Sequence, residues 1–283
     1  MDSEEKKKLN IIAIADDSEY GLSALRYGGI LAAVFKSSLT VITDFSFASS
    51  SKAGSSVTKS VNHEFLLLGN QFIAQGIETI LVSDPFTPEN IYTYANDTNT
   101  IMFVIGVQKK GEDCLFSLKK ARRFIKPSRL PVMTVGKKLP AADIFRHVLL
   151  PLDIDRQHKE KTLWAGYFSR FYQAKVHVLS GKYKDQFLKK KVKDNIDFTE
   201  KLYKNLEIDY ESHQLDREID DIDRFSLAYA SLVNASLTVI MMTSYYTVID
   251  YLFGPKENDI IANDVDLPVL CINERDDLYV LCT

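Results

Sequence analysis

Two aspartates and a serine, Asp16, Asp17 and Ser18, follow a hydrophobic run in the stretch LNIIAIADDSEYGLSAL, which begins at Leu9. Paired acids at the end of a buried strand could hold Mg²⁺, receive a phosphoryl group or contact a nucleotide. They could also accept hydrogen bonds from the first N–H groups of a helix, which is a purely structural role. The residue types alone leave these alternatives open.

Two phosphate-binding loops are disfavoured by the residues themselves. An ATP pyrophosphatase of the PP-loop type needs a turn rich in glycine and serine after the first strand, where backbone N–H groups surround pyrophosphate. The turn ADDSEYG places acids there instead, and like charges repel. A Walker loop is absent, because the sequence contains no GK[ST].

The elements that position these residues occur twice in the chain. Asp16 is matched by Asp153, since 153 − 16 = 137. The segments SLTVITD, TIMFVIG and LPVMTVGK are matched, at the same offset, by KVHVLSG, LTVIMMT and LPVLCINE. The third strand-like segment has a different offset, 208 − 77 = 131. We therefore predict two similar domains, residues 1–141 and 142–283.

Each copy alternates strands with helices. In the first copy, the strands are predicted at about 11–15, 39–43, 78–83, 101–106 and 132–136. The central strands are continuously apolar, which is typical of a parallel sheet covered on both faces. The pattern predicts an α/β fold with two tandem, doubly wound, five-stranded parallel sheets. Ligands in such sheets bind beyond the carboxyl ends of the strands, where Asp16, Gly106, Asp153 and Thr243 are expected.

The helical segment TLWAGYFSRFY is unusually aromatic. We interpret its large apolar residues as core packing rather than as a cofactor site: Leu163, Trp164, Tyr167, Phe168 and Phe171.

A phosphoacceptor receiver domain would add an aspartate after strand three and a lysine after strand five, and Asp84 and Lys137 imitate these. The offset from Asp16 to Asp84, 84 − 16 = 68, is too long for that fold. In the second copy, Glu274 replaces the lysine and Ile154 replaces the second acid of the pair. Both differences argue against a receiver domain.

Over residues 8–275, the chain resembles a tandem universal stress protein. The first strand of that family ends in a D-G-S-E-like turn, matched by ADDSEYGLSAL, and its fifth strand is similar to PVMTV and PVLCI. The resemblance implies a Rossmann-like, adenine nucleotide alpha hydrolase-like sheet in the order 3-2-1-4-5. It also implies pairing through strand five, either within this chain as a pseudo-dimer or between two chains as a homodimer.

ATP-binding members of the family carry G-x₂-G-x₉-G-[ST] after strand four, where glycines let the backbone approach phosphates. In the first copy, Gly106 fits the first position, but Lys109 occupies the second and Gly111 comes two positions late. The final pair falls at Lys119 and Lys120.

The second copy departs from the loop pattern further. Thr243 and Tyr246 take the first two glycine positions, and bulky Tyr245 lies beside them. Gly254 stands near the last glycine but is followed by Pro255, which has no N–H to offer a phosphate.

The resemblance implies that Asp16 and Asp153 would face a nucleoside, whereas capping of a helix is the structural alternative. The structural role is favoured for Asp153, and both remain open for Asp16. The candidate nucleotide-site positions are Asp16, Asp17, Ser18, Gly106, Lys109, Gly111, Asp153 and Gly254.

We predict a non-catalytic protein that works in stress response or regulation through protein interaction, with degenerate ATP-binding loops and no cofactor. The alternative is an adenine-nucleotide-binding stress protein that uses the first copy, with slow ATP hydrolysis.

The bulk composition limits the partners. The chain has 283 residues, a net charge of −3 and a pI near 6.0, so no general field attracts nucleic acid or anionic lipid. Its three cysteines form no CxxC motif, and its five histidines have no ligand spacing, so no metal site is predicted. The polar N-terminus and the absence of a long apolar run lead us to expect a soluble, cytoplasmic protein.

Overall fold

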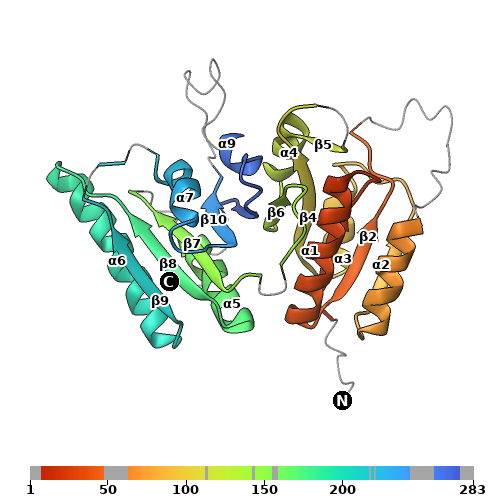
Figure 1. Cartoon of the computed structure of the whole chain (residues 1–283), viewed down its shortest axis with the longest axis horizontal. Helices are drawn as coiled ribbons and strands as arrows, with labels where there is room; N and C mark the ends of the chain where they lie inside the picture. The colour runs from red at the N-terminus through yellow and green to blue at the C-terminus, as the bar shows by residue number, and fades with distance from the viewer. Residues whose placement is uncertain are drawn as a thin grey trace. The chain divides into compact units, whose positions relative to one another are not determined.

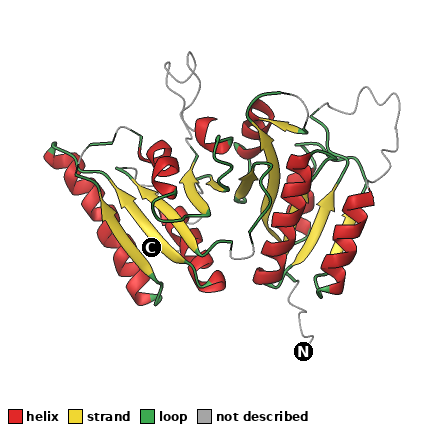
Figure 2. Cartoon of the chain, viewed as in Figure 1, coloured by secondary structure: helices red, strands yellow, loops and turns green. Residues whose placement is uncertain are grey.

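The computed structural model describes residues 8–47, 63–111, 114–141, 144–154, 159–216, 218–219, 221–242 and 258–274. The chain divides into two compact units, Met1–Pro140 (unit 1) and Ala141–Thr283 (unit 2). Within each unit, strands lie side by side and helices pack against them (Figures 1 and 2).

The elements of unit 1 are β1 (Asn10–Ile14), α1 (Glu19–Phe35), β2 (Ser38–Ile42), α2 (His63–Ala74), β3 (Thr79–Val82), α3 (Ile91–Asp97), β4 (Thr100–Gln108), β5 (Phe116–Ser117), α4 (Leu118–Ile125) and β6 (Val132–Val135). Five of its strands form a parallel sheet in the order β3-β2-β1-β4-β6. The short strand β5 pairs with the end of β4.

The elements of unit 2 are β7 (His147–Leu152), α5 (Lys159–Tyr172), β8 (Lys175–Ser180), α6 (Gln186–Asn205), β9 (Tyr210–Gln214), α7 (Ile222–Ala230), β10 (Leu237–Met241), α9 (Asn258–Ile261) and β11 (Val269–Ile272). Its sheet is parallel and has the order β9-β8-β7-β10-β11. Both sheets follow the order 3-2-1-4-5, which confirms the predicted fold class.

The strand positions repeat the internal offset. Four pairs of corresponding strands begin at one common offset, since 147 − 10, 175 − 38, 237 − 100 and 269 − 132 all equal 137. The third pair has a smaller offset, 210 − 79 = 131. The same scaffold is therefore present in both units.

A buried polar residue joins three strands of unit 1. The Nδ2 of Asn10 donates to the hydroxyl of Thr100 at 3.0 Å, and its Oδ1 accepts from Ser38 at 3.0 Å and Thr40 at 3.1 Å. Because the amide is almost fully buried, these bonds offset its desolvation.

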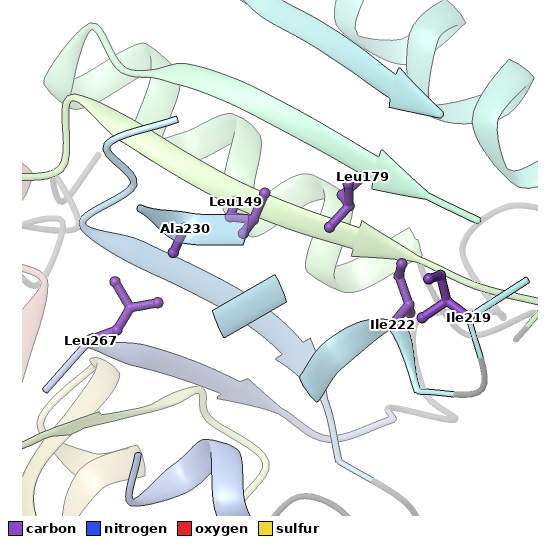
Figure 3. Packing of buried hydrophobic residues seen from close by; sticks show 6 residues of the cluster. All are labelled: Leu149, Leu179, Ile219, Ile222, Ala230 and Leu267. Atoms are coloured by element: carbon purple, nitrogen blue, oxygen red, sulfur yellow. The ribbon is translucent and has the colours of Figure 1, made fainter. Parts of the chain in front are cut away.

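In unit 2, one face of the sheet packs against α7. Figure 3 shows Leu149 of β7 and Leu179 of β8 on this face, together with Ile222 and Ala230 of α7. Side chains alternate between the two faces of a strand, so Val178 points the other way and lines a cavity beside α6.

The aromatic helix α5 differs from the prediction of core packing. Phe168 is buried and Trp164 is half-buried, but Leu163, Tyr167 and Phe171 are exposed at 36%, 43% and 47%. These three side chains are four positions apart, so they share a line along the helix that does not face the sheet. The core-packing interpretation was therefore wrong for them.

Among the residues that the structure describes, no helix combines the length and the apolar character needed to cross a membrane.

Candidate functional site

Asp16 lies just beyond the carboxyl end of β1, and both of its carboxylate oxygens have partners within unit 1. Its Oδ1 accepts hydrogen bonds from the hydroxyl of Ser18 and, at 3.3 Å, from the Ser18 N–H. Its Oδ2 accepts a hydrogen bond from the backbone N–H of Leu115. The adjacent Asp17 is exposed. The carboxylate therefore joins the start of α1 to the segment that follows β4.

Ser18 is the residue that caps α1. It has extended backbone geometry, and its Oγ accepts a hydrogen bond from the N–H of Gly21 at 3.1 Å. The same hydroxyl donates to Asp16, so it is held in place from both sides. The predicted capping role thus belongs to Ser18, with Asp16 orienting it.

Gly106 lies in β4, beside the end of β1. A Cβ at this position would overlap the backbone carbonyl of Tyr20, in the first turn of α1. A Cβ at Gly21 would likewise overlap the backbone of Asp16. The missing side chains of both glycines make room for close contact between parts of this chain.

The segment after β4 covers the carboxyl end of the sheet. β5 brings Phe116 opposite Val107 and Ser117 opposite Gln108. Cys114 is buried, and its Sγ donates to the carbonyl of Phe116 at 3.3 Å. Burial, with a further contribution from the negative charge of Asp16, raises the pKa of Cys114 to about 11.

Phe116 is 1% exposed and belongs to an aromatic cluster. Its ring centroid lies 5.6 Å from Phe45, 5.6 Å from Phe47 and 5.5 Å from Phe124. Lys120 lies over the ring of Phe47, with its Nζ 5.9 Å from the centroid. Sequence reasoning missed this cluster, because its members come from distant parts of unit 1 and share no periodicity.

Two other predicted site residues occupy the turn after β4. Lys109 is half-buried and Gly111 is exposed. Gly111 has a φ of 109°, a backbone conformation that residues with a side chain rarely adopt. The turn itself therefore explains why a glycine is found at 111.

In unit 2, Asp153 is the counterpart of Asp16 but has different partners. Its Oδ1 accepts hydrogen bonds from the N–H of Ile154 at 2.7 Å and from the hydroxyl of Tyr183. Its backbone carbonyl accepts a bond from Asn195 of α6 at 2.6 Å. The predicted residues Thr243, Tyr245, Tyr246 and Gly254 lie outside the described part of unit 2.

A cavity of about 600 Å³ lies beside α6, near the carboxyl ends of β8 and β9. Two of the lysines in its lining have acidic partners: Lys182 is paired with Asp216, and Lys193 lies 2.8 Å from Asp197. These carboxylates offset the charge that would draw an anion into the cavity.

The sequence and the structure were each compared with those of known proteins. No family model matches the sequence, and no curated protein matches it. A universal stress protein from Archaeoglobus fulgidus has a TM-score of 0.67 and 13% identity over 93% of this chain and 98% of that chain. The chain has the fold of a tandem universal stress protein.

Two proteins from Pseudomonas aeruginosa share this tandem universal stress protein fold. One, assigned to the same family, has a TM-score of 0.62 and 14% identity. The other, of unknown function, has a TM-score of 0.61 and 15% identity. Each match covers 96% of this chain and 95% of that protein. At such identities, the likeness establishes the fold alone.

Proposed function

We propose that this protein is a non-catalytic universal stress-like protein of the cytoplasm that works in stress response or regulation through protein interaction, without bound ATP. The observation that carries the proposal is the placement of Leu115 and Phe116. The N–H of Leu115 donates to Asp16, and the Phe116 ring is buried among other aromatic rings.

A phosphate cradle needs backbone N–H groups that are free to bind, and space for the backbone to approach the ligand. In unit 1, the Leu115 N–H is already bonded, and the backbone of Tyr20 fills the space beside Gly106. A nucleotide would have to displace both and lie near the charge of Asp16. Loss of these internal bonds would oppose ATP binding.

The proposed interaction has a candidate surface on α5. Leu163, Tyr167 and Phe171 form an exposed apolar line over two helical turns. Aromatic residues contribute strongly to protein interfaces, because they bury a large area at a low cost in conformational entropy. This line is the part of unit 2 that we expect a protein partner to cover.

One observation favours the alternative of an adenine-nucleotide-binding protein with slow ATP hydrolysis. Asp16 follows β1 and Gly106 lies near the end of the neighbouring strand β4, and Lys109, Lys119 and Lys120 come after them in the chain. The positions that the resemblance assigns to a nucleotide are thus followed in the chain by three lysines, whose positive charge favours an anion.

The two proposals are separated by native mass spectrometry of the freshly purified chain, followed by calorimetric titration with MgATP. We expect no co-purified adenine nucleotide and no binding heat at millimolar ATP. The titration is repeated with Asp16→Asn and, as a matched control, with the exposed neighbour substituted as Asp17→Asn. Binding that Asp16→Asn removes and Asp17→Asn retains would establish the alternative.

A further inference from the structure

Three histidines meet on neighbouring strands of unit 2. The Nδ1 of His147 on β7 lies 2.9 Å from the Nε2 of His177 on β8. The Nδ1 of His177 lies 3.0 Å from the Nε2 of His213 on β9. Figure 3 shows Leu149 and Leu179 on the face of the sheet that packs against α7. His147 and His177 each stand two positions before one of these leucines, so the alternation of side chains along a strand places them on the same face.

An acidic side chain completes the group. Glu211 lies opposite His177 in the register of β8 and β9, and it stands two positions before His213 on the same strand. Its Oε1 is 4.0 Å from the Nε2 of His213. One donor atom from each of His177, Glu211 and His213 can be chosen so that all three lie within 4.8 Å of one another.

We propose that His177, Glu211 and His213 bind a divalent transition metal ion, with Zn²⁺ as the ion that the donor set fits. Two nitrogens that each lie about 2.0–2.1 Å from a tetrahedral zinc ion are about 3.3 Å apart. The Nδ1 of His177 and the Nε2 of His213 are 3.0 Å apart, so a small shift would admit the ion. Two imidazoles and a carboxylate are ligands that zinc accepts, and they leave a coordination position for water.

His147 supplies the supporting contact that such a site needs. A histidine that binds metal through one ring nitrogen usually donates its other N–H to an acceptor, which fixes the tautomer. His177 would bind through Nδ1 and donate its Nε2–H to the Nδ1 of His147. His213 would bind through Nε2 and carry its proton on Nδ1. Each of these rings keeps one proton, so neutral histidines need release none.

Glu211 lies at the exposed side of the group. His177 is 4% exposed, whereas the Glu211 side chain is 53% exposed on β9, the last strand in the order of unit 2. Lys175 lies 3.7 Å from the Oε2 of Glu211, which leaves Oε1 to face His213. The ring of Tyr229 on α7 lies 5.6 Å from that of His213.

Zn²⁺ alone, titrated calorimetrically into the full chain freed of any histidine tag, tests the proposal. We expect one specific site, weakened at least about 100-fold by His213→Ala and at least about tenfold by Glu211→Gln. His147→Ala should weaken it about tenfold, as for other outer contacts of metal ligands. The matched control is His63→Ala, which removes an exposed histidine at the start of α2 and should leave the affinity unchanged.

Circular dichroism verifies that each variant is folded, and Glu211→Gln changes only an exposed side chain of similar shape. Co²⁺ provides a second readout, because its visible absorption bands should form with the wild-type chain and weaken with Glu211→Gln. The proposal is overturned if Zn²⁺ binds the wild type and the His213→Ala/Glu211→Gln double variant equally, or if only His63→Ala reduces binding.

Discussion

Single residues at the carboxyl end of the unit 1 sheet are explained by contacts within the chain. Gly106 accommodates the backbone of Tyr20, and Asp16 binds Ser18 and Leu115. The family resemblance would have Gly106 and Asp16 contact a ligand, whereas these contacts predict that both residues stabilise the fold. A measurement of the free energy of unfolding can therefore test their structural role. Two predictions belong to this scale.

The first prediction concerns Gly106→Ala. The new Cβ would overlap the Tyr20 carbonyl, so α1 or β4 must shift, and we expect the free energy of unfolding to fall by about 2–3 kcal/mol. Urea unfolding followed by circular dichroism measures this. Gly69→Ala in α2 is the control, since its added Cβ meets no atom within 4 Å apart from its chain neighbours and the nearby backbone of its own helix, and alanine favours a helix by up to about 1 kcal/mol. Equal stability of Gly106→Ala and the wild type would refute the packing role.

The second prediction concerns the thiol of Cys114. A free cysteine has a pKa of about 8.5, so at that pH it is half ionised, whereas the pKa of Cys114 is about 11. Since the thiolate is the reactive form, alkylation of Cys114 at pH 8.5 should be about 100-fold slower in the folded chain than in urea. Mass spectrometry of the modified peptide measures both rates, and similar rates would contradict the burial argument.

The same shift has a consequence for stability. The unfolded chain loses the thiol proton at lower pH than the folded chain, so the contribution of Cys114 is complete below about pH 8.5. It is then lost as the pH rises toward 11.

At the scale of elements, the three polar residues that follow β1 have different roles at the start of α1. Ser18 caps the helix, Asp16 orients Ser18, and Asp17 is exposed. Ser18→Ala removes the bond to the Gly21 N–H and the hydroxyl bound to Asp16, so we expect a loss of about 1 kcal/mol in the free energy of unfolding. Asp17→Ala is the matched control, because Asp17 is exposed, and its effect should stay within about 0.5 kcal/mol. Thermal unfolding of both variants checks this, and a larger loss for Asp17→Ala would reverse the assignment.

The sequence predicted the elements whose signal is local. Apolar runs such as IIAIA marked the strands, and the constant offset between matching segments related the two copies. β5 was missed because so short a strand carries no periodicity, and its position depends on pairing with β4. The aromatic line on α5 was misjudged because helical spacing alone does not say which line faces the sheet.

The histidine cluster shows a further limit of sequence reasoning. His147, His177 and His213 have no motif spacing, and strand register in a folded sheet brings them together. Likewise, neither Leu115 as the partner of Asp16 nor Tyr183 as the partner of Asp153 can be inferred from the spacing of residues along the chain.

At the scale of the whole molecule, one scaffold is used twice with different internal partners. Asp16 in unit 1 accepts a bond from a backbone N–H beyond β4, whereas Asp153 in unit 2 accepts one from a tyrosine hydroxyl beyond β8. The sheet order is common to both units, while the groups around each aspartate differ. The two aspartates therefore have different surroundings, so the two units do not share one ligand-binding arrangement at these positions.

The remaining prediction concerns association between copies of the chain through α5. In a symmetric dimer, the same surface of both subunits forms the contact, so a line of apolar residues can pack against its own copy. Leu163, Tyr167 and Phe171 provide such a line, and full burial of a large apolar side chain contributes about 1.5–3 kcal/mol. We expect the wild type to dimerise with increasing concentration in sedimentation velocity.

The double variant Leu163→Glu/Tyr167→Glu should weaken this dimer at least about tenfold, because two carboxylates per subunit would be buried or brought together. The control is Leu232→Glu, which places a carboxylate at an apolar residue that is 74% exposed and lies just after α7. It should sediment as the wild type does. If the double variant and the wild type showed the same concentration dependence, α5 would not form the contact.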